Sequence, residues 1–330
     1  MSRRLLGLAL SSFALGLIAV PTAQAGEIVG WGDDMYHGQV SDVPAGDDFI
    51  AIAAGGETAY ALRADGSIVA WGDDQSSQVS NAPAGGGFKA ISAGGGNGYA
   101  LREDGSIIAW GADYYGQISD APTGGGFKAI AATTYGGYAL REDGTIVGWG
   151  IAEYGQASGT PTEDGFVAIA GGHFTGYGLG GDGSIAVWGY LSAGLGSNAP
   201  AEGGFTAIAA GGFAAYALRA DGSILAWGDD RFGQVSDAPT GDGFIAIAGG
   251  YLTGYALRAD GSIVAWGYDD AGQVSDVPQG TGFTALAASS FAAFALRGTA
   301  TAVPEPSSLI AAGSATVILA GVALRRRRDA

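Results

Sequence analysis

The sequence predicts an all-β protein, a seven-bladed β-propeller. Three observations carry this prediction: a Trp-Gly pair that recurs every 39 residues, an Asp-Gly pair at one place in each copy, and two partial copies at the ends that complement each other. A unit of this size cannot bury its apolar face alone and must stack against its neighbours. The tryptophans of these pairs are Trp31, Trp71, Trp110, Trp149, Trp188, Trp227 and Trp266, with 40 residues between the first two.

Each complete copy contains three short apolar segments that are typical of β-strands. Residues 126–150 read GFKAIAATTYGGYALREDGTIVGWG, with apolar runs at 127–132, 138–141 and 145–149. Runs this short, without helix caps, favour strands. Asp-Gly joins the second strand to the third, as in tight hairpins, because glycine tolerates a positive φ. A further segment of each copy, such as 234–237, is expected to cross to the next copy. The turn aspartates are Asp65, Asp104, Asp143, Asp182, Asp221 and Asp260.

The two partial copies predict a closed ring. Residues 27–32 supply only a third strand, and residues 282–297 supply only a first and a second strand. Pairing the N-terminal strand with the C-terminal blade completes one unit and removes exposed sheet edges. Small residues such as Ala53, Ala54 and Gly55 suit the crowded strand near the axis, whereas Trp71 and its equivalents suit the wider outer wedge between blades.

The repeated segments resemble those of a known family. GFxAIAxG, YALRxDGSIVAWG and GQVSDxP, spread over residues 27–298, are similar to the short repeats of β-lactamase inhibitory protein type II, which belongs with the regulator of chromosome condensation propellers. The resemblance implies a seven-bladed propeller with a partner-binding face. It also implies that aromatic residues on that face contact the partner, as the inhibitor uses its own against an enzyme.

The N-terminal 25 residues resemble a secretory signal peptide. Arg3 and Arg4 precede an apolar stretch at 5–20, and Ala23-Gln24-Ala25 provides a cleavage site before Gly26. A retained membrane anchor is the alternative interpretation. The propeller is then expected to occupy residues 26–300.

Residues 301–330 have the three parts of a sorting tail: a Pro-Glu-Pro motif, an apolar run at 309–324 and a basic end at 325–328. The apolar run is expected to form a transmembrane helix of about 24 Å with the arginines on the cytoplasmic side. The order of the parts resembles the PEP-CTERM signal, which implies processing by an exosortase and display on the outer surface or matrix of a Gram-negative bacterium. A permanent single-span anchor is the alternative. The signal residues are Pro304, Glu305, Pro306, Arg325, Arg326, Arg327 and Arg328.

The charge of the expected propeller excludes one class of partner. Of 15 Lys and Arg, six lie in the terminal segments, and of 32 Asp and Glu, Glu305 and Asp329 lie in the tail, which leaves 9 basic and 30 acidic residues and a net charge near −21. Such a surface repels phosphate backbones, so nucleic acid is not an expected partner. The chain has no cysteine and therefore no disulfide framework.

Catalysis finds little support in the sequence, and the protein is not expected to be an enzyme or to hold a cofactor or metal. The two histidines are His37 and His173, and there is no phosphate loop or nucleophile elbow. Aspartate pairs recur with the repeat, which is typical of turn residues rather than of general acids. Glycan hydrolysis or lysis and weak calcium binding by these pairs remain alternatives. The pairs are Asp33-Asp34, Asp73-Asp74, Asp229-Asp230 and Asp269-Asp270.

The loop after the first strand carries the strongest binding signal. Strand direction places this loop and the loop after Trp-Gly at the same end of the ring, opposite the Asp-Gly turns. Five consecutive copies have a large apolar or aromatic side chain at one position of the first loop, where loop tips are usually polar. These residues are Tyr135, Phe174, Phe213, Leu252 and Phe291; the first two copies have Glu57 and Gly96 instead.

The second loop is expected to form an outer rim around this arc. Tyrosine is a common interface anchor, and nearby aspartates could steer a basic partner. The alternative is that the rings of both loops fold inward and cap the apolar core. The predicted rim residues are Tyr115, Tyr154, Tyr190, Phe232 and Tyr268.

Two classes of function follow from this surface. The favoured hypothesis is a non-catalytic, exported propeller that binds a protein partner through the aromatic loops, in the manner of an inhibitor. The alternative is a matrix component that binds exopolysaccharide, because exposed tyrosine rings stack on sugars.

Overall fold

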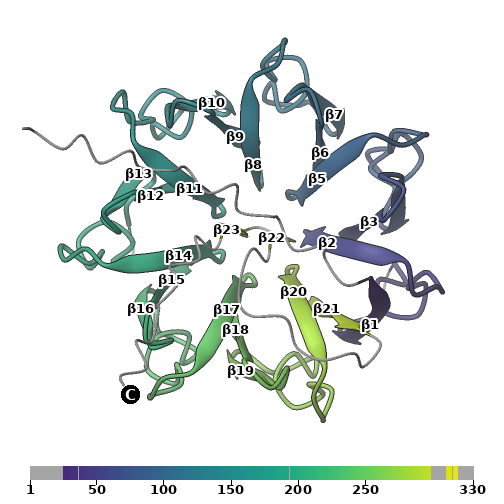
Figure 1. Ribbon diagram of the computed structural model, residues 1–330, viewed down its shortest axis with the longest axis vertical. Helices are drawn as coiled ribbons and strands as arrows, with labels where there is room; N and C mark the ends of the chain where they lie inside the picture. Colours follow the sequence, from purple (N-terminus) through teal and green to yellow (C-terminus); the bar gives the residue numbers. More distant parts are fainter. Residues whose placement is uncertain (1–24, 36, 193, 299–309, 314, 319–330) are drawn as a thin grey trace, which may run out of the picture.

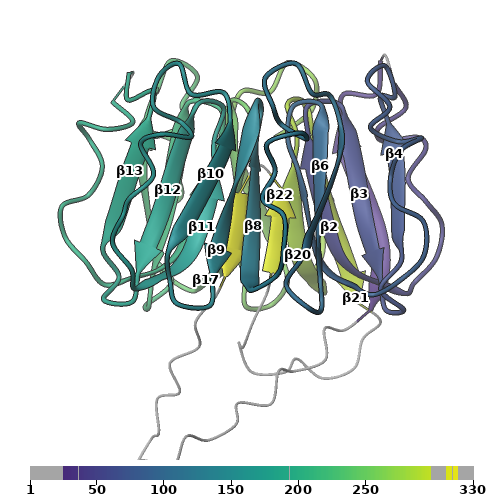
Figure 2. The same ribbon diagram turned by 90° about the horizontal axis from the view of Figure 1, so that it is seen from above.

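The computed structural model describes residues 25–35, 37–192, 194–298, 310–313 and 315–318. Within these residues every helix-or-strand element is a β-strand, and three-stranded antiparallel sheets recur along the chain. The sheets are arranged radially around a central axis (Figure 1), and their strands run roughly along that axis (Figure 2). The chain thus has the all-β, repeated-sheet architecture of a β-propeller, as predicted.

The strands fall into three sets according to their distance from the axis. The first strands, nearest the axis, are β2 (Phe49–Gly55), β5 (Phe88–Ala93), β8 (Phe127–Thr133), β11 (Phe166–Gly171), β14 (Phe205–Ala210), β17 (Phe244–Gly249) and β20 (Phe283–Ala288). The second strands are β3 (Thr58–Arg63), β6 (Asn97–Arg102), β9 (Gly136–Arg141), β12 (Thr175–Gly180), β15 (Ala214–Arg219), β18 (Thr253–Arg258) and β21 (Ala292–Gly298). The third strands are β4 (Ile68–Gly72), β7 (Ile107–Gly111), β10 (Ile146–Gly150), β13 (Ile185–Gly189), β16 (Ile224–Gly228), β19 (Ile263–Gly267) and β1 (Gly26–Gly32).

The Asp-Gly pairs form the predicted tight turns between second and third strands. Gly144 has a φ of 88°, a conformation that glycine adopts without strain. The Asp143 carboxylate accepts a hydrogen bond from the backbone N–H of Thr145 at 2.9 Å, which fixes the turn. The segments after the third strands consist of turns and lead to the next copy, as expected.

The N-terminal strand pairs with the C-terminal second strand, which confirms the predicted pairing of the chain ends. β1 runs antiparallel to β21, with Val29 opposite Ala295 and Gly30 opposite Phe294. One further pair, Gly26 opposite Phe49, links β1 to β2, so that one six-stranded sheet joins the first and last copies. The first strands also lie beside one another in chain order, and β20 lies beside β2.

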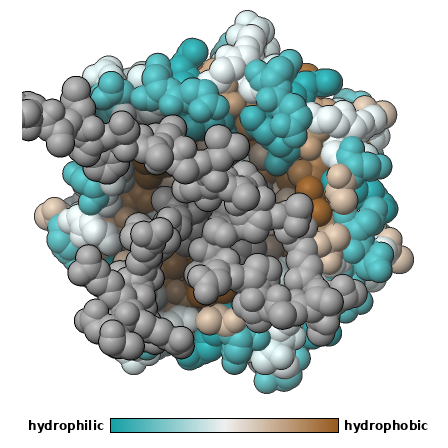
Figure 3. Space-filling view, in the orientation of Figure 1, coloured by the Kyte–Doolittle hydropathy of each residue, from teal (hydrophilic) through white to brown (hydrophobic). Residues whose placement is uncertain are grey.

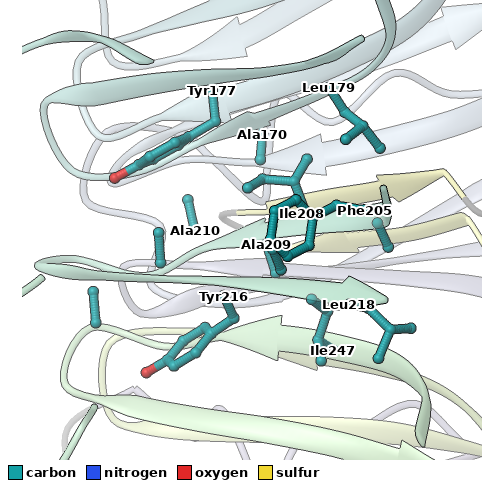
Figure 4. Close-up of a cluster of buried hydrophobic side chains, with 14 of the residues drawn as sticks. Ala170, Tyr177, Leu179, Phe205, Ile208, Ala209, Ala210, Tyr216, Leu218 and Ile247 are labelled. Atoms are coloured by element: carbon teal, nitrogen blue, oxygen red, sulfur yellow. The ribbon is translucent and has the colours of Figure 1, made fainter. Parts of the chain in front are cut away.

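The apolar core lies between adjacent sheets. Second strands are sandwiched between two neighbouring sheets, so that five successive residues of β12 are buried. Tyr177 and Leu179 of this strand project into the space before the next sheet, and Phe205 and Ile208 of that sheet belong to the same buried cluster (Figure 4). Large side chains thus fill the space between sheets, and the fold does not depend on one central core.

Close to the axis, the backbones of adjacent sheets lie too near one another to leave room for large side chains. A Cβ on Gly94 would collide with the carbonyl oxygen of Thr133 in the adjacent sheet. Ala53 and Ala54 are fully buried there. The expected preference for small residues near the axis is therefore confirmed.

The tryptophans occupy the predicted positions between sheets and link each sheet to its predecessor. The Trp110 ring packs edge-on against Tyr60, with centroids 5.1 Å apart. Its Nε1–H donates to the backbone carbonyl of Gln78 at 2.9 Å. Across the chain ends, Trp31 Nε1–H donates to the carbonyl of Gln273 at 3.1 Å.

The prediction of a transmembrane helix at 309–324 is wrong for the part of that segment that the structure describes. Residues there form two short antiparallel strands, β22 (Ile310–Gly313) and β23 (Ala315–Ile318), near the axis beside β2 and β11 (Figure 1). The described part contains Gly313 and four β-branched residues, which have weak helix propensity. The β-branched residues are Ile310, Thr316, Val317 and Ile318. None of the described residues belongs to a helix long and apolar enough to span a bilayer. The remaining residues of the tail signal, and residues 1–24 of the predicted signal peptide, lie outside the described residues.

Candidate partner-binding face

Two sets of loops lie at one end of the ring, which we call the mouth face. The inner loops join first to second strands, and the outer loops follow third strands; the antiparallel order brings both to this end. Tyr190 N–H of an outer loop donates to the carbonyl of Phe174 in the inner loop at 3.0 Å, so the two loops are in direct contact. The Asp-Gly turns lie at the opposite end.

A continuous cluster of aromatic rings covers much of the mouth face. Tyr135 stacks on Phe174 with centroids 5.3 Å apart, and Tyr115 packs edge-on against Tyr135 at 5.3 Å. Edge-to-face and offset pairs at this separation are favourable. The chain of contacts extends through neighbouring sheets. The aromatic cluster comprises Tyr115, Tyr135, Tyr154, His173, Phe174, Tyr190, Phe213, Tyr251 and Phe291.

The structure brings most of the predicted site residues together, although their role in binding stays a prediction. Four of the five arc residues belong to the cluster and are half-buried, so they neither fold fully inward nor stand free. Leu252, the fifth, is also half-buried. The rim tyrosines Tyr115, Tyr154 and Tyr190 join the cluster and are exposed. The rings of Phe232 and Tyr268 form a separate pair, with centroids 5.1 Å apart.

His173 and Tyr251 are cluster members that the sequence analysis did not select. Each stands one residue before the predicted arc position, where the other copies have glycine, serine or threonine. The His173 ring lies 4.1 Å from Phe174 and 5.6 Å from Tyr251, centroid to centroid. Its Nδ1 pairs with the Thr134 hydroxyl at 2.7 Å, and burial lowers the pKa of the imidazole. These two large residues, at a position where the other copies have small ones, are the sequence signal that could have identified them as part of the cluster.

A small pocket opens at the centre of the mouth face. It has a volume of about 150 Å³ and lies where the inner loops converge. Backbone hydrogen bonds between adjacent inner loops hold its wall, including Tyr251 N–H to Ser289 O at 3.3 Å and Ser290 N–H to Gly56 O at 3.1 Å. The side chains of Thr134, His173 and Tyr251 also line it.

Carboxylates lie at both ends of the ring, but basic residues are distributed unevenly between them. Of the basic residues in 26–300, all except Arg231 lie at the hairpin end of first or second strands: Arg63, Lys89, Arg102, Lys128, Arg141, Arg219, Arg258 and Arg297. Figure 3 views that end, where hydrophilic residues form most of the outer rim. The inner and outer loops of the mouth carry Asp33, Asp34, Glu57, Asp73, Asp74, Asp113, Glu153, Asp229, Asp230, Asp269 and Asp270.

The single arginine of the mouth loops leaves this acidity largely uncompensated. Arg231 is paired with Asp229, at 2.5 Å between Nη2 and Oδ2, and that carboxylate is only 7% exposed. The mouth face is therefore strongly acidic and rich in aromatic rings.

The recurring aspartates have structural roles, as the sequence analysis favoured. Asp74 Oδ1 accepts hydrogen bonds from the backbone N–H groups of Val79 and Ser80, at 2.9 and 2.8 Å. These donors lower the pKa of the Asp74 carboxyl, and Asp230 repeats the arrangement. A general acid needs a raised pKa to hold its proton near neutrality, so these groups are poorly suited to acid catalysis. Among the described residues no cluster of three potential ligands could hold a metal ion.

Comparisons with known proteins agree with this architecture. Residues 49–78, 88–117 and 205–234 match the Regulator of chromosome condensation (RCC1) repeat, and residues 302–328 match the PEP-CTERM protein-sorting motif. Neither is an enzyme family, and RCC1-like propellers are generally binding or exchange-factor folds. A comparison with curated proteins gives no match.

Solved structures with low sequence identity share the fold. Prp20p from Saccharomyces cerevisiae is 15% identical over 84% of this chain and 92% of its own, with a TM-score of 0.66. The receptor kinase CR4 ectodomain from Physcomitrella patens is 23% identical over 72% of this chain and 66% of its own, with a TM-score of 0.60. The ACR4 ectodomain from Arabidopsis thaliana is 22% identical over 71% of this chain and 85% of its own, with a TM-score of 0.58.

At these identities the likeness establishes the fold alone. The resemblance to β-lactamase inhibitory protein is not shown by these matches and stays a prediction. The sorting motif indicates export in a Gram-negative bacterium. Three segments of the chain therefore match the RCC1 repeat, its fold is that of RCC1-like propellers, and residues 302–328 match the PEP-CTERM sorting motif.

Proposed function

We propose that residues 26–300 form a closed, seven-bladed propeller between a signal peptide at 1–25 and a sorting tail at 301–330. The β1–β21 pairing, the Trp31–Gln273 hydrogen bond and the Ser290–Gly56 hydrogen bond all support closure, because each connects the N-terminal part of the chain to its C-terminal part. An exosortase would process the tail near Pro304-Glu305-Pro306 and release the propeller to the outer surface or matrix.

The propeller acts as a non-catalytic binding protein, and its mouth face takes a protein partner. The observation that carries this proposal is the aromatic cluster, in which rings of several adjacent sheets are in contact and remain partly exposed. Contiguous exposed rings on a rigid scaffold are typical of interaction surfaces, in which aromatic anchors supply most of the binding energy. Prp20p, which shares the fold, binds Gsp1p and histones. Inhibition of an enzyme, which the inhibitor resemblance implies, would be one use of this face.

Capture of proteins from the surface of the producing bacterium tests this proposal. The full chain is expected to retain a defined partner that the double variant Phe174→Ala and Phe213→Ala does not retain, since each large truncation at an anchor costs about 2 kcal/mol or more of binding energy. Lys89→Ala, at the hairpin end, is the matched control and should bind as the parent does. Equal capture by the parent and the double variant would remove the cluster from the binding site.

Exopolysaccharide is the second candidate partner. Tyr115, Tyr154 and Tyr190 are exposed and could stack on sugar rings. Binding to glycans on an array, lost in Tyr154→Ala and unchanged in Lys89→Ala, would favour a matrix component over a protein-binding role.

A further inference from the structure

The pocket at the centre of the mouth face has aromatic walls on one side. Tyr251 lies 5.6 Å from His173 and 5.2 Å from Phe213 between ring centroids, and 6.5 Å from Phe291. Tyr251 and His173 line the pocket directly. Aromatic faces attract cations, and the attraction increases when the cation is desolvated in a pocket.

The polar part of the lining can accept hydrogen bonds from a cation. Thr134 and Ser290, which carry hydroxyl groups, and several glycines line the pocket. His173 adds little positive charge near neutral pH, because burial lowers its pKa and its Nδ1 is engaged by Thr134. A guanidinium or ammonium group would therefore meet aromatic rings and oxygen acceptors. Arg231, which interacts electrostatically with Tyr251, is already paired with Asp229.

The surroundings of the pocket favour the same ligand charge. The mouth loops carry many carboxylates, and the guanidinium of Arg231 is already paired with Asp229. The summed field of an acidic face raises the local concentration of cationic groups and the rate of their association.

We propose that this pocket binds an arginine or lysine side chain that projects from a basic partner protein. The inference rests on the proposed protein-binding function and names the chemistry of its anchor: a long cationic side chain enters at the axis while neighbouring residues of the partner contact the surrounding rings. A pocket of about 150 Å³ accommodates one side chain and not a folded element.

Peptide titration of the full chain tests this inference. The probe is a fluorescent glycine-serine peptide with two arginines, and its counterpart carries citrulline, which keeps the shape and removes the charge. The arginine peptide is expected to bind about fivefold or more tighter than the citrulline peptide, and Tyr251→Ala should abolish that preference. Ser290→Lys, which places a cation in the pocket and removes no ring, should have the same effect. Tyr114→Ala is the matched control, because Tyr114 is 78% exposed and does not line the pocket.

The outcomes separate this inference from the function on which it rests. Equal binding of the two peptides, or a preference that survives both Tyr251→Ala and Ser290→Lys in folded protein, would overturn the cation pocket. If a captured partner depends on Phe174 and Phe213 but not on Tyr251, the protein-binding role holds and the pocket assignment is wrong. Tighter binding of simple sugars than of the arginine peptide would likewise contradict it.

Discussion

Single side chains hold adjacent sheets together at recurring points. The indole of Trp110 combines two interactions: ring packing against Tyr60 and donation to the Gln78 carbonyl. The fourth copy departs from this pattern, because Trp188 Nε1 has no hydrogen-bond partner among the described residues. The two tryptophans therefore separate the contribution of the ring from that of its N–H group.

Replacement of Trp110 by phenylalanine should lower the free energy of unfolding by more than the same change at Trp188. The variant removes one of two donors to the buried Gln78 carbonyl, since the Tyr60 hydroxyl also donates to it at 3.2 Å. The lost hydrogen bond costs about 1 kcal/mol beyond the loss of packing. Trp188→Phe loses ring volume and the interaction of its N–H with Tyr138, but no hydrogen bond to a backbone carbonyl. Denaturant unfolding of both variants measures the difference, and equal losses would show that the N–H groups add nothing.

The residue scale is also where sequence reasoning was least complete. The repeat frame directed attention to one column of the inner loop, which holds Tyr135, Phe174 and Phe213. His173 and Tyr251 belong to the preceding column, and ring contacts between loops of different sheets join the two columns into one cluster. Contacts between sheets are not encoded in any single copy of the repeat.

At the scale of elements, the strands and turns were predictable and the tail was not. The second strand of the third copy was expected at 138–141 and is found at Gly136–Arg141, a typical boundary error. Strand period and turn chemistry are local, so they can be read from one copy. The helix expected at 309–324 rested on an apolar run and assumed a bilayer, whereas β22 and β23 lie against strands of the ring.

The Asp113 carboxylate stabilises its outer loop by accepting hydrogen bonds from the backbone. Asp113→Asn should therefore lower the stability of the fold. Asp113 Oδ1 accepts hydrogen bonds from the N–H groups of Ile118 and Ser119 at 2.8 and 3.0 Å, and these donors lower the pKa of its carboxyl. The carboxylate therefore stabilises the fold above pH 3.8, and this contribution disappears as the pH falls through the lowered folded-state pKa.

Thermal unfolding of the parent and Asp113→Asn across acidic and neutral pH checks this prediction. The parent should melt at a higher temperature at pH 7, and the gap should shrink toward pH 3 as the parent's carboxylate is protonated. Glu153→Gln, in an exposed outer-loop position, serves as the control and should leave the melting temperature nearly unchanged. A gap that stays constant with pH would contradict the assigned role.

At the scale of the whole molecule, closure of the ring decides the stability of the proposed propeller. The chain has no cysteine, so a pair introduced at Val29→Cys and Ala295→Cys can be crosslinked without side reactions. The two residues are direct partners in the β1–β21 ladder, at a spacing that permits a disulfide.

The oxidised Val29→Cys, Ala295→Cys protein should unfold at a higher denaturant concentration than its reduced form, by about 2–4 kcal/mol in the free energy of unfolding. The control combines Val29→Cys with Ala217→Cys in β15, which lies on another side of the ring (Figure 1), and should not crosslink within one molecule. Failure of the first pair to crosslink in folded protein would argue against closure.

The pairing of β1 with β21 also sets an order of events during export. In a chain that crosses the membrane from its N-terminus, β1 emerges first. Its backbone N–H and C=O groups lack their β21 partners until β21 emerges, just before the sorting tail. Completion of the last sheet therefore coincides with arrival of the sorting tail. A polypeptide truncated before β21 would leave the edge of β1 unpaired and exposed. Periplasmic quality control would then recognise the chain as incompletely folded.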